Sequence, residues 1–193
     1  MKRLGSSLIL LMAGCLNSPP LHAQVTYERI RNAAQEPQNW LTYSGSYSGQ
    51  RHSGLDQISA ATVKNLVPKW VFQSGALGKW ETTPLVVDGI LYGTSQDDRA
   101  FALDARTGRP IWEYQRILPS DIRPCCGRVN RGFAILGDKL YYATLDAHVV
   151  ALDARTGAVV WNVAAIDYRK GYSFTMAPLA VKNMIIVGVS GGE

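Results

Sequence analysis

A seven-residue stretch that occurs twice constrains the fold of this chain more than any other feature. Ala-Leu-Asp-Ala-Arg-Thr-Gly occupies residues 102–108 and again residues 151–157. Each copy is followed by a tryptophan, Trp112 or Trp161, and the offset from 102 to 151 is 49 residues. About half of the positions in residues 91–112 are identical in the second copy. Such a period indicates one structural unit that is used several times.

Each unit has the pattern of short strands joined by tight turns. Residues 84–92 are apolar on both sides of Asp88-Gly89, residues 133–142 repeat this pattern, and residues 178–187 form a weaker third copy. Asp-Gly between β-branched and aromatic runs predicts a two-residue hairpin. Neither unit shows the 3.6-residue apolar period of a helical repeat. The sequence therefore predicts an all-β fold of four-stranded blades, a β-propeller, with about three blades present.

The tryptophan that ends each unit has a structural explanation. Trp112 and Trp161 are expected to pack as large flat side chains between adjacent blades, and Trp70 ends a similar segment one blade earlier. We therefore assign these side chains to the blade interfaces and not to a ligand site.

Residues 1–23 have the three parts of an export signal. Lys2 and Arg3 give a positive start, an apolar run follows, and Leu-His-Ala ends at Ala23, after which cleavage is expected. Met-Ala-Gly-Cys, ending at Cys15, is the competing signal, because it resembles a bacterial lipobox in which the cysteine is acylated. The first signal predicts a periplasmic protein, and the second a protein attached peripherally to a membrane.

The composition excludes two classes of protein. The chain has 47% hydrophobic and 18% charged residues, and without Lys2 and Arg3 it carries 18 basic against 15 acidic residues, or +3. This balance is too small for a nucleic-acid footprint. No apolar run reaches the eighteen or so residues of a spanning helix, which excludes a polytopic membrane protein.

Two adjacent cysteines remain once the leader is removed. Cys125 and Cys126 could be a free pair in a turn, half of a thiolate metal site, or a vicinal disulfide. The remaining histidines, His52 and His148, have no ligand-like spacing to each other or to the pair, which disfavours zinc. An oxidising compartment favours the disulfide, and such a strained bridge is usually kept at a working site.

Several motifs of this sequence together resemble those of one known family. The repeat Ala-x-Asp-x-x-Thr-Gly-x-x-x-Trp is similar to that of the quinoprotein alcohol dehydrogenases, the methanol and ethanol dehydrogenase family that uses pyrroloquinoline quinone (PQQ) and Ca²⁺. Four segments match more specifically: residues 39–45, 81–89, 125–132 and 190–193. The most specific is Cys-Cys-Gly-Arg-Val-Asn-Arg-Gly at 125–132.

The resemblance implies a PQQ site built from the first part of the chain. Glu81 would hydrogen-bond the cofactor, and a Cys125–Cys126 bridge would lie flat against one face of the ring. Arg131 would approach the reactive quinone oxygens. A planar tricarboxylate needs such a flat platform and cationic or hydroxyl partners.

The remaining implied site residues come from later in the sequence. Thr175 and Ser190 would hold cofactor carboxylates, helped by the amides of Gly191 and Gly192. Glu193 would be a ligand of Ca²⁺, which prefers hard oxygen ligands, with a lanthanide as the alternative metal.

The resemblance also implies the reaction: oxidation of a primary alcohol to an aldehyde by hydride transfer to metal-bound PQQ, with electrons passed to a cytochrome c. The family has an eight-bladed ring, so residues 24–193 would be its amino-terminal part. The catalytic base of the family has no counterpart here, so we expect this polypeptide to be inactive alone. The alternatives are a noncatalytic propeller scaffold of the outer-membrane assembly type, for which the cysteine pair would have no use, and a soluble glucose-dehydrogenase type.

Overall fold

The computed structural model describes residues 24–191, so the predicted leader, Gly192 and Glu193 lie outside the described residues. Within them the chain is almost entirely strand and turn, with one α-helix, α1 (Tyr27–Arg31). The strands are β1 (Leu85–Val87), β2 (Ile90–Ser95), β3 (Arg99–Asp104), β4 (Pro110–Gln115), β5 (Ala134–Leu136), β6 (Lys139–Ala143), β7 (His148–Asp153), β8 (Val159–Ala164), β9 (Leu179–Val181) and β10 (Met184–Ile186).

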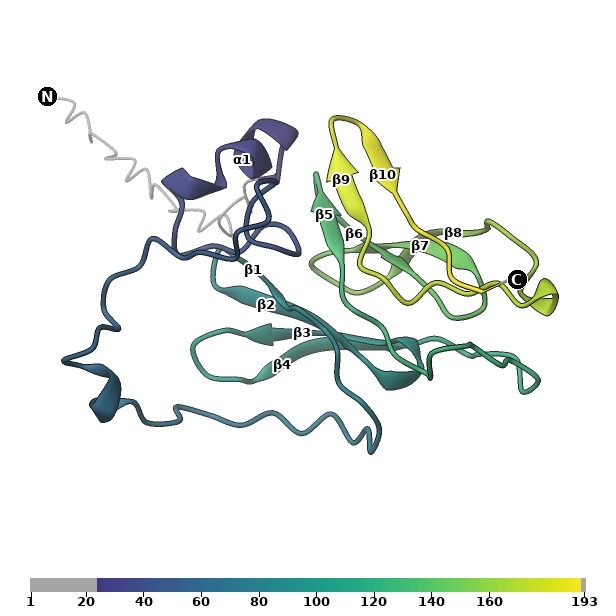
Figure 1. The fold of residues 1–193 in the computed structure, drawn as a ribbon, viewed down its shortest axis with the longest axis horizontal. Coiled ribbons are helices and arrows are strands. Elements are labelled where there is room, and N and C mark those ends of the chain that lie inside the picture. Colours follow the sequence, from purple (N-terminus) through teal and green to yellow (C-terminus); the bar gives the residue numbers. More distant parts are fainter. Residues whose placement is uncertain (1–23, 192–193) are drawn as a thin grey trace, which may run out of the picture.

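These strands form two four-stranded antiparallel sheets and one hairpin (Figure 1). The first blade has the order β1-β2-β3-β4, the second β5-β6-β7-β8, and the hairpin pairs β9 with β10. The register repeats: Tyr92 pairs with Ala102 in the first blade as Tyr141 pairs with Ala151 in the second. The predicted all-β, bladed architecture is confirmed, with two blades and the start of a third in the described residues.

The Asp-x-x-Thr-Gly motif forms the turn between the third and fourth strands of a blade. The Asp104 carboxylate accepts hydrogen bonds from the backbone N–H groups of Arg106 and Thr107 and from the Thr107 hydroxyl, at 2.8–3.0 Å. Asp153 accepts the same three bonds in the second blade. Identical local sequence therefore builds identical turns, because aspartate satisfies backbone donors locally.

Each such turn receives a tryptophan from the preceding repeat. The indole Nε1–H of Trp112 donates to the carbonyl of Ala154 at 2.9 Å, and its ring lies directly over Gly157. Trp70 donates in the same way to the Ala105 carbonyl at 3.1 Å. The predicted packing between blades is confirmed for Trp112. For Trp161 it stays a prediction, because that residue is 37% exposed and the described residues contain no turn of a following blade that could receive it.

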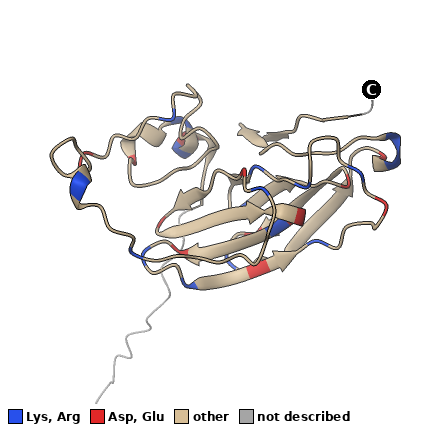
Figure 2. Cartoon of the chain, turned by 60° about the horizontal axis from the view of Figure 1, so that its bottom comes forward, with Lys and Arg blue, Asp and Glu red and all other residues tan. Residues whose placement is uncertain are grey.

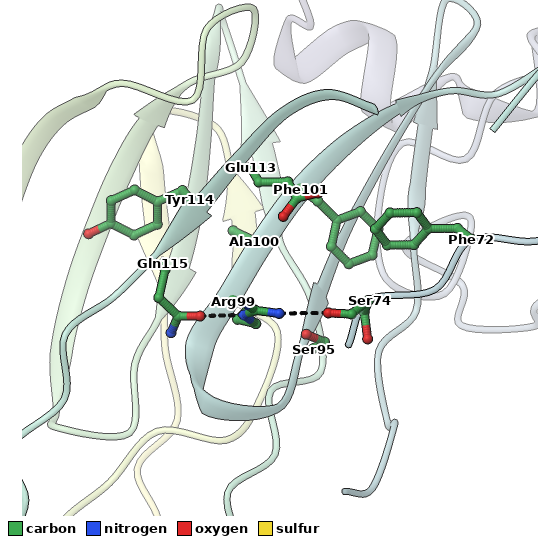
Figure 3. Close-up of a pocket in the computed structure, with 9 residues that line it drawn as sticks. All are labelled: Phe72, Ser74, Ser95, Arg99, Ala100, Phe101, Glu113, Tyr114 and Gln115. Atoms are coloured by element: carbon green, nitrogen blue, oxygen red, sulfur yellow. Dashed lines mark hydrogen bonds between the residues drawn. The ribbon is translucent and has the colours of Figure 1, made fainter. Parts of the chain in front are cut away.

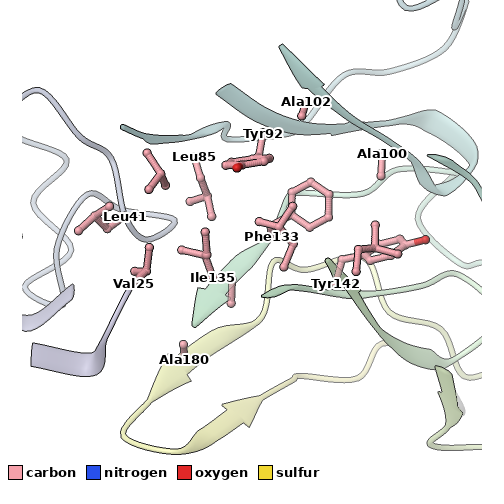
Figure 4. Close-up of a cluster of buried hydrophobic side chains, with 14 of the residues drawn as sticks. Val25, Leu41, Leu85, Tyr92, Ala100, Ala102, Phe133, Ile135, Tyr142 and Ala180 are labelled. Atoms are coloured by element: carbon pink, nitrogen blue, oxygen red, sulfur yellow. The ribbon is translucent and has the colours of Figure 1, made fainter. Parts of the chain in front are cut away.

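The core lies between the two blades and the amino-terminal segment (Figure 4). Leu85, Phe133, Leu140 and Tyr142 are at most 1% exposed and belong to one buried cluster of aliphatic and aromatic residues. Burying such side chains contributes about 2 kcal/mol each. The core therefore fixes the angle between the blades, and with it the loops at their ends.

The amino-terminal segment ties the three repeats together. Val25 exchanges backbone hydrogen bonds with Gly137 of the second blade, and Trp40 does so with Val86 of the first. The Tyr47 hydroxyl donates to the carbonyl of Ala180 in β9 at 2.5 Å. This segment therefore crosses one edge of all three sheets.

The outer surface carries charges of both signs, dispersed over strands and loops (Figure 2). Among the described residues, no helix has both the length and the apolar character needed to cross a bilayer. Residues 50–80 run along the outside and are mostly exposed.

Candidate functional site

Arg131 joins residues from three repeats at one point. Its Nη2 donates to Oε2 of Glu81, which precedes the first blade, at 2.5 Å. Its Nη1 donates to the hydroxyl of Thr175, which precedes β9, at 2.9 Å, and to the Thr175 carbonyl at 3.2 Å. The side chains of Arg131 and Glu81 are each about one-third exposed. The guanidinium is therefore oriented by the protein and still open to a ligand.

The backbone around Arg131 is held as firmly as its side chain. The Arg131 N–H donates to the Thr175 carbonyl at 3.2 Å, and its carbonyl accepts from the Thr83 N–H at 3.1 Å. The next residue, Gly132, has φ +121°, and a Cβ there would lie 2.8 Å from the Thr83 carbonyl oxygen. Only glycine fits both the conformation and the space. The Asn-Arg-Gly sequence thus allows the close approach of two loops.

Cys125 and Cys126 are exposed free thiols in the structure, so the predicted vicinal bridge is not formed in it. A hydrogen bond with Cys125 raises the pKa of the Cys126 thiol, and the charges of Arg131 and Glu81 act on that group with opposite signs. Cys126 is therefore near enough to the Arg131 guanidinium, called the Arg131 fork below, for that charge to act on its thiol. A raised pKa keeps the Cys126 thiol protonated, which makes its sulfur a poor metal ligand in this state. The bridge stays a prediction.

Ser190 lies beside the loop that carries Thr175. Ser190 and Ser173 exchange backbone hydrogen bonds of 2.9 Å, and their hydroxyls are 3.1 Å apart. Gly191 packs against the Gly171 carbonyl so closely that a Cβ would come within 2.1 Å of it. These two predicted residues are therefore joined to the segment that carries Thr175, two residues after Ser173.

Glu193, the predicted metal ligand, lies outside the described residues, as does Gly192. Within residues 24–191, no group of three His, Cys, Asp or Glu side chains is arranged to hold a metal ion. A complete metal site is thus not formed by the described residues alone.

Two buried polar residues under Arg131 were missed by the sequence reasoning as site residues. Asp98 is 0% exposed and Asn130 is 1% exposed, and the Nδ2 of Asn130 donates to Oδ1 of Asp98 at 2.9 Å. The signal was in the sequence: the position equivalent to Asp98 in the second repeat is Ala147. A carboxylate at a position where the other copy of the repeat has alanine indicates a specific polar partner.

A separate small cavity of about 100 Å³ lies outside this site (Figure 3). Arg99 crosses it, donating to the Ser74 carbonyl at 2.6 Å and to Gln115 Oε1 at 2.5 Å. Phe72 and Phe101 form its apolar wall. None of the predicted site residues lines it, so we do not assign it to the cofactor.

The chemistry of the Arg131 site fits PQQ. A planar tricarboxylate needs cationic and hydroxyl donors at its edge and a flat soft surface against its face. Arg131 supplies a charged donor, Thr175 and Ser190 supply hydroxyl groups, and the exposed cysteine pair supplies adjacent sulfurs. The described residues could hold one edge and one face of such a group.

Comparison with known proteins identifies the family of the chain. Residues 40–192 match the family model described as "PQQ: Glucose/ethanol/alcohol dehydrogenase, beta-propeller domain". The chain is 41% identical over 186 residues to the quinoprotein alcohol dehydrogenase PedH of Pseudomonas putida, covering 95% of this chain and 31% of that protein. It is 42% identical over 196 residues to the 1-butanol dehydrogenase (quinone) of Thauera butanivorans, covering 97% of this chain and 32% of that protein.

Solved structures give the same result. A europium-containing methanol dehydrogenase superimposes with a TM-score of 0.81 at 37% identity, covering 86% of this chain and 30% of that one. The quinohemoprotein alcohol dehydrogenase ADHIIG of Pseudomonas putida HK5 gives 0.80 at 37% identity, covering 88% and 26%. The chain thus spans about a third of the length of the curated relatives it matches. On its motifs, its blades and these matches, the chain belongs to the PQQ-dependent alcohol dehydrogenase β-propeller family.

Proposed function

We propose that this chain supplies part of the cofactor site of an enzyme that oxidises a primary alcohol to an aldehyde with PQQ and a metal ion. The observation that carries the proposal is the Arg131 fork, which binds Glu81 and Thr175 from two other repeats beside the cysteine pair. The names of the relatives, which include alcohol, butanol and methanol dehydrogenases, support an alcohol as substrate.

Different described residues would bind different parts of the cofactor. When bound, PQQ supplies the quinone carbonyl that accepts hydride from the alcohol. Arg131 would hold the reactive edge by charge, and Glu81 would accept a hydrogen bond while keeping the guanidinium in place. Thr175 and Ser190 would bind the carboxylates. A preorganised cation in a partly desolvated site stabilises negative charge that develops there.

Three further parts of the proposal rest on the resemblance. The Cys125–Cys126 pair would close into a vicinal disulfide after export and form the platform for the ring. Gly191 and Gly192 would offer amides, and Glu193 would bind Ca²⁺ or a lanthanide. Electrons would pass to a cytochrome c in the periplasm.

We also propose that these 193 residues alone bind PQQ weakly and do not turn over alcohol. The resemblance assigns the proton-abstracting aspartate and the second face of the cofactor sandwich to residues without a counterpart here. Dye-linked alcohol oxidation by the purified chain with PQQ and Ca²⁺, at rates near those of the full-length relatives, would refute this.

A titration tests the proposed site. The chain is mixed with PQQ and Ca²⁺, and binding is followed by the absorbance of the quinone and by tryptophan fluorescence. Arg131→Gln removes a charged hydrogen-bond donor, so its dissociation constant should rise by a factor of about 10–100. Arg169→Gln is the matched control, because Arg169 is 73% exposed and lies outside the site. Equal affinity of the wild-type chain and Arg131→Gln would contradict the proposal.

A further inference from the structure

Asp98 occupies a position where the two blades share a backbone conformation but differ in chemistry. Asp98 and its repeat equivalent Ala147 both have left-handed φ values, +55° and +60°. Asp98 is 0% exposed, and its carboxylate accepts from the Leu145 N–H at 2.6 Å and from the Asn130 amide at 2.9 Å. The turn itself does not need a carboxylate, because alanine makes it in the second blade. We therefore attribute the role of the carboxylate to the groups that it binds and not to the turn.

The main partner, Asn130, is hydrogen-bonded at every polar atom of its side chain. Its Nδ2 donates to Asp98 Oδ1 and to the Ala143 carbonyl, both at 2.9 Å. Its Oδ1 accepts from the Gly132 N–H at 3.0 Å, and its backbone carbonyl accepts from the Thr94 hydroxyl at 3.2 Å. Asn130 is thus attached to both blades and to its own loop.

Arg131 follows directly and points to the site. A long flexible side chain loses on the order of 2 kcal/mol of rotamer entropy when it is ordered. A backbone that is already fixed at Arg131 reduces the number of positions that the guanidinium can take before a ligand binds. The bonds of Asn130 and Gly132 fix that origin on both sides. Glu81 and Thr175 then fix the far end.

We propose that Asp98 and Asn130 are a positioning pair, which holds the backbone of Arg131 so that its guanidinium meets the edge of the cofactor. The proposal rests on the proposed function of Arg131 but concerns residues that do not themselves touch the ligand. It predicts that removal of either side chain of the pair lowers PQQ affinity only because Arg131 is then no longer held in place.

A double-mutant cycle tests this dependence. Asn130→Ala should raise the PQQ dissociation constant about tenfold in the wild-type background and leave it unchanged in the Arg131→Gln background, because coupled residues are not additive. Its loss of thermal stability should persist in both backgrounds. Asn39→Ala is the matched control, since Asn39 is also a buried amide, bonded to Glu36 and Asp88, but lies away from the site. An equal loss of PQQ affinity in both backgrounds would overturn the proposal.

A second measurement needs no PQQ. Hydrogen exchange of the Arg131 and Thr83 amides in the free chain should be at least tenfold faster in Asn130→Ala than in Asn39→Ala. Unchanged exchange at both amides would overturn the positioning role. A wild-type chain that binds no PQQ would overturn the proposed function instead, and the exchange rates would still decide whether Asn130 fixes Arg131.

A milder variant keeps the proposal testable if Asn130→Ala fails to fold. Thr94→Val removes the hydroxyl that donates to the Asn130 carbonyl with little change in volume. It should shift both measurements in the same direction by a smaller factor. If Thr94→Val lowers stability but moves neither PQQ affinity nor exchange at Arg131, the positioning role is wrong.

Discussion

The first and second blades have the same strand order and the same register, yet their fourth strands lie in different surroundings. Trp112 in β4 is 9% exposed and packs on the turn of the second blade, whereas Trp161 in β8 is 37% exposed. The two residues occupy equivalent positions of one repeat. The sequence repeat therefore encodes the structure of a blade, whereas the burial of its fourth strand depends on the neighbouring blade.

A pair of equivalent aspartates shows the same contrast. Asp146 in the second blade forms an ion pair with Arg116 at 2.6 Å, and both side chains are at most 7% exposed. Asp97 in the first blade pairs with Arg128, and both side chains are about 40% exposed. Burial acts to raise the pKa of Asp146, but hydrogen bonds from Arg116 and Thr144 outweigh it and lower that pKa. One sequence position thus serves as a surface contact and as a buried link.

The tryptophans offer the strongest test of this contrast. Trp112→Ala removes a buried ring and its bond to Ala154, so the free energy of unfolding should fall by about 4 kcal/mol. Trp161→Ala should lower it by only about 2 kcal/mol, because Trp161 is 37% exposed against 9% for Trp112 and therefore buries less apolar area. Urea denaturation of both variants measures the difference. Equal losses would mean that neighbouring blades do not decide the energetics.

The aspartates should give the next largest effect. Asp146→Ala leaves Arg116 as an unpaired buried charge and should cost about 3 kcal/mol. Asp97→Ala should cost less than about 1 kcal/mol, as exposed pairs contribute little. Thermal unfolding at neutral pH checks the order of the two variants. If Asp97→Ala proves the more damaging, the assignment of the buried link is wrong.

The two blades should also differ in their response to pH, because Asp98 can titrate and its equivalent Ala147 cannot. Burial raises the pKa of Asp98 to about 7, against about 4 in an unfolded chain. The folded state therefore binds a proton more tightly, and the stability from this group is full below about pH 4 and is lost as the pH rises through 7.

Asp98→Asn removes that titration, while other groups cancel in the comparison with the wild type. The stability of the wild type relative to Asp98→Asn should fall by about 2 kcal/mol from pH 5 to pH 8. Denaturant titrations at the two pH values measure this. A difference that is independent of pH would show that Asp98 does not titrate in this range.

The smallest expected effect isolates the contact between blades. A Cβ at Gly157 would meet the Trp112 ring at 2.6 Å, whereas Gly137 has a similar positive φ and open space around its Cβ position. Both Gly→Ala variants incur the same backbone strain, of about 1 kcal/mol. Gly157→Ala should therefore cost a further 1–2 kcal/mol, roughly, from overpacking. Equal unfolding midpoints for the two variants would argue against close packing of Trp112 in solution.

Features of this chain that repeat or that are local could be predicted from the sequence. The 49-residue period, the Asp-Gly and Asp-x-x-Thr-Gly turns and the strands between them all follow from short-range patterns, and the structure has them where expected. The specific motifs also named Glu81, Arg131 and Thr175, which the structure brings together. Their roles toward PQQ stay predictions.

The tertiary structure decided what the sequence pattern treats as equivalent. By itself the sequence determined the blades, their turns and the residue types of the site, because these depend on hydrogen bonds and side-chain alternation within a few residues. Only the packed fold decided that Trp112 is buried while Trp161 is exposed, and that Asp98 meets Asn130 under Arg131. The physical reason is that burial and charge pairing depend on which distant segments lie alongside a residue. Two copies of a repeat can have the same local sequence and still have different neighbours.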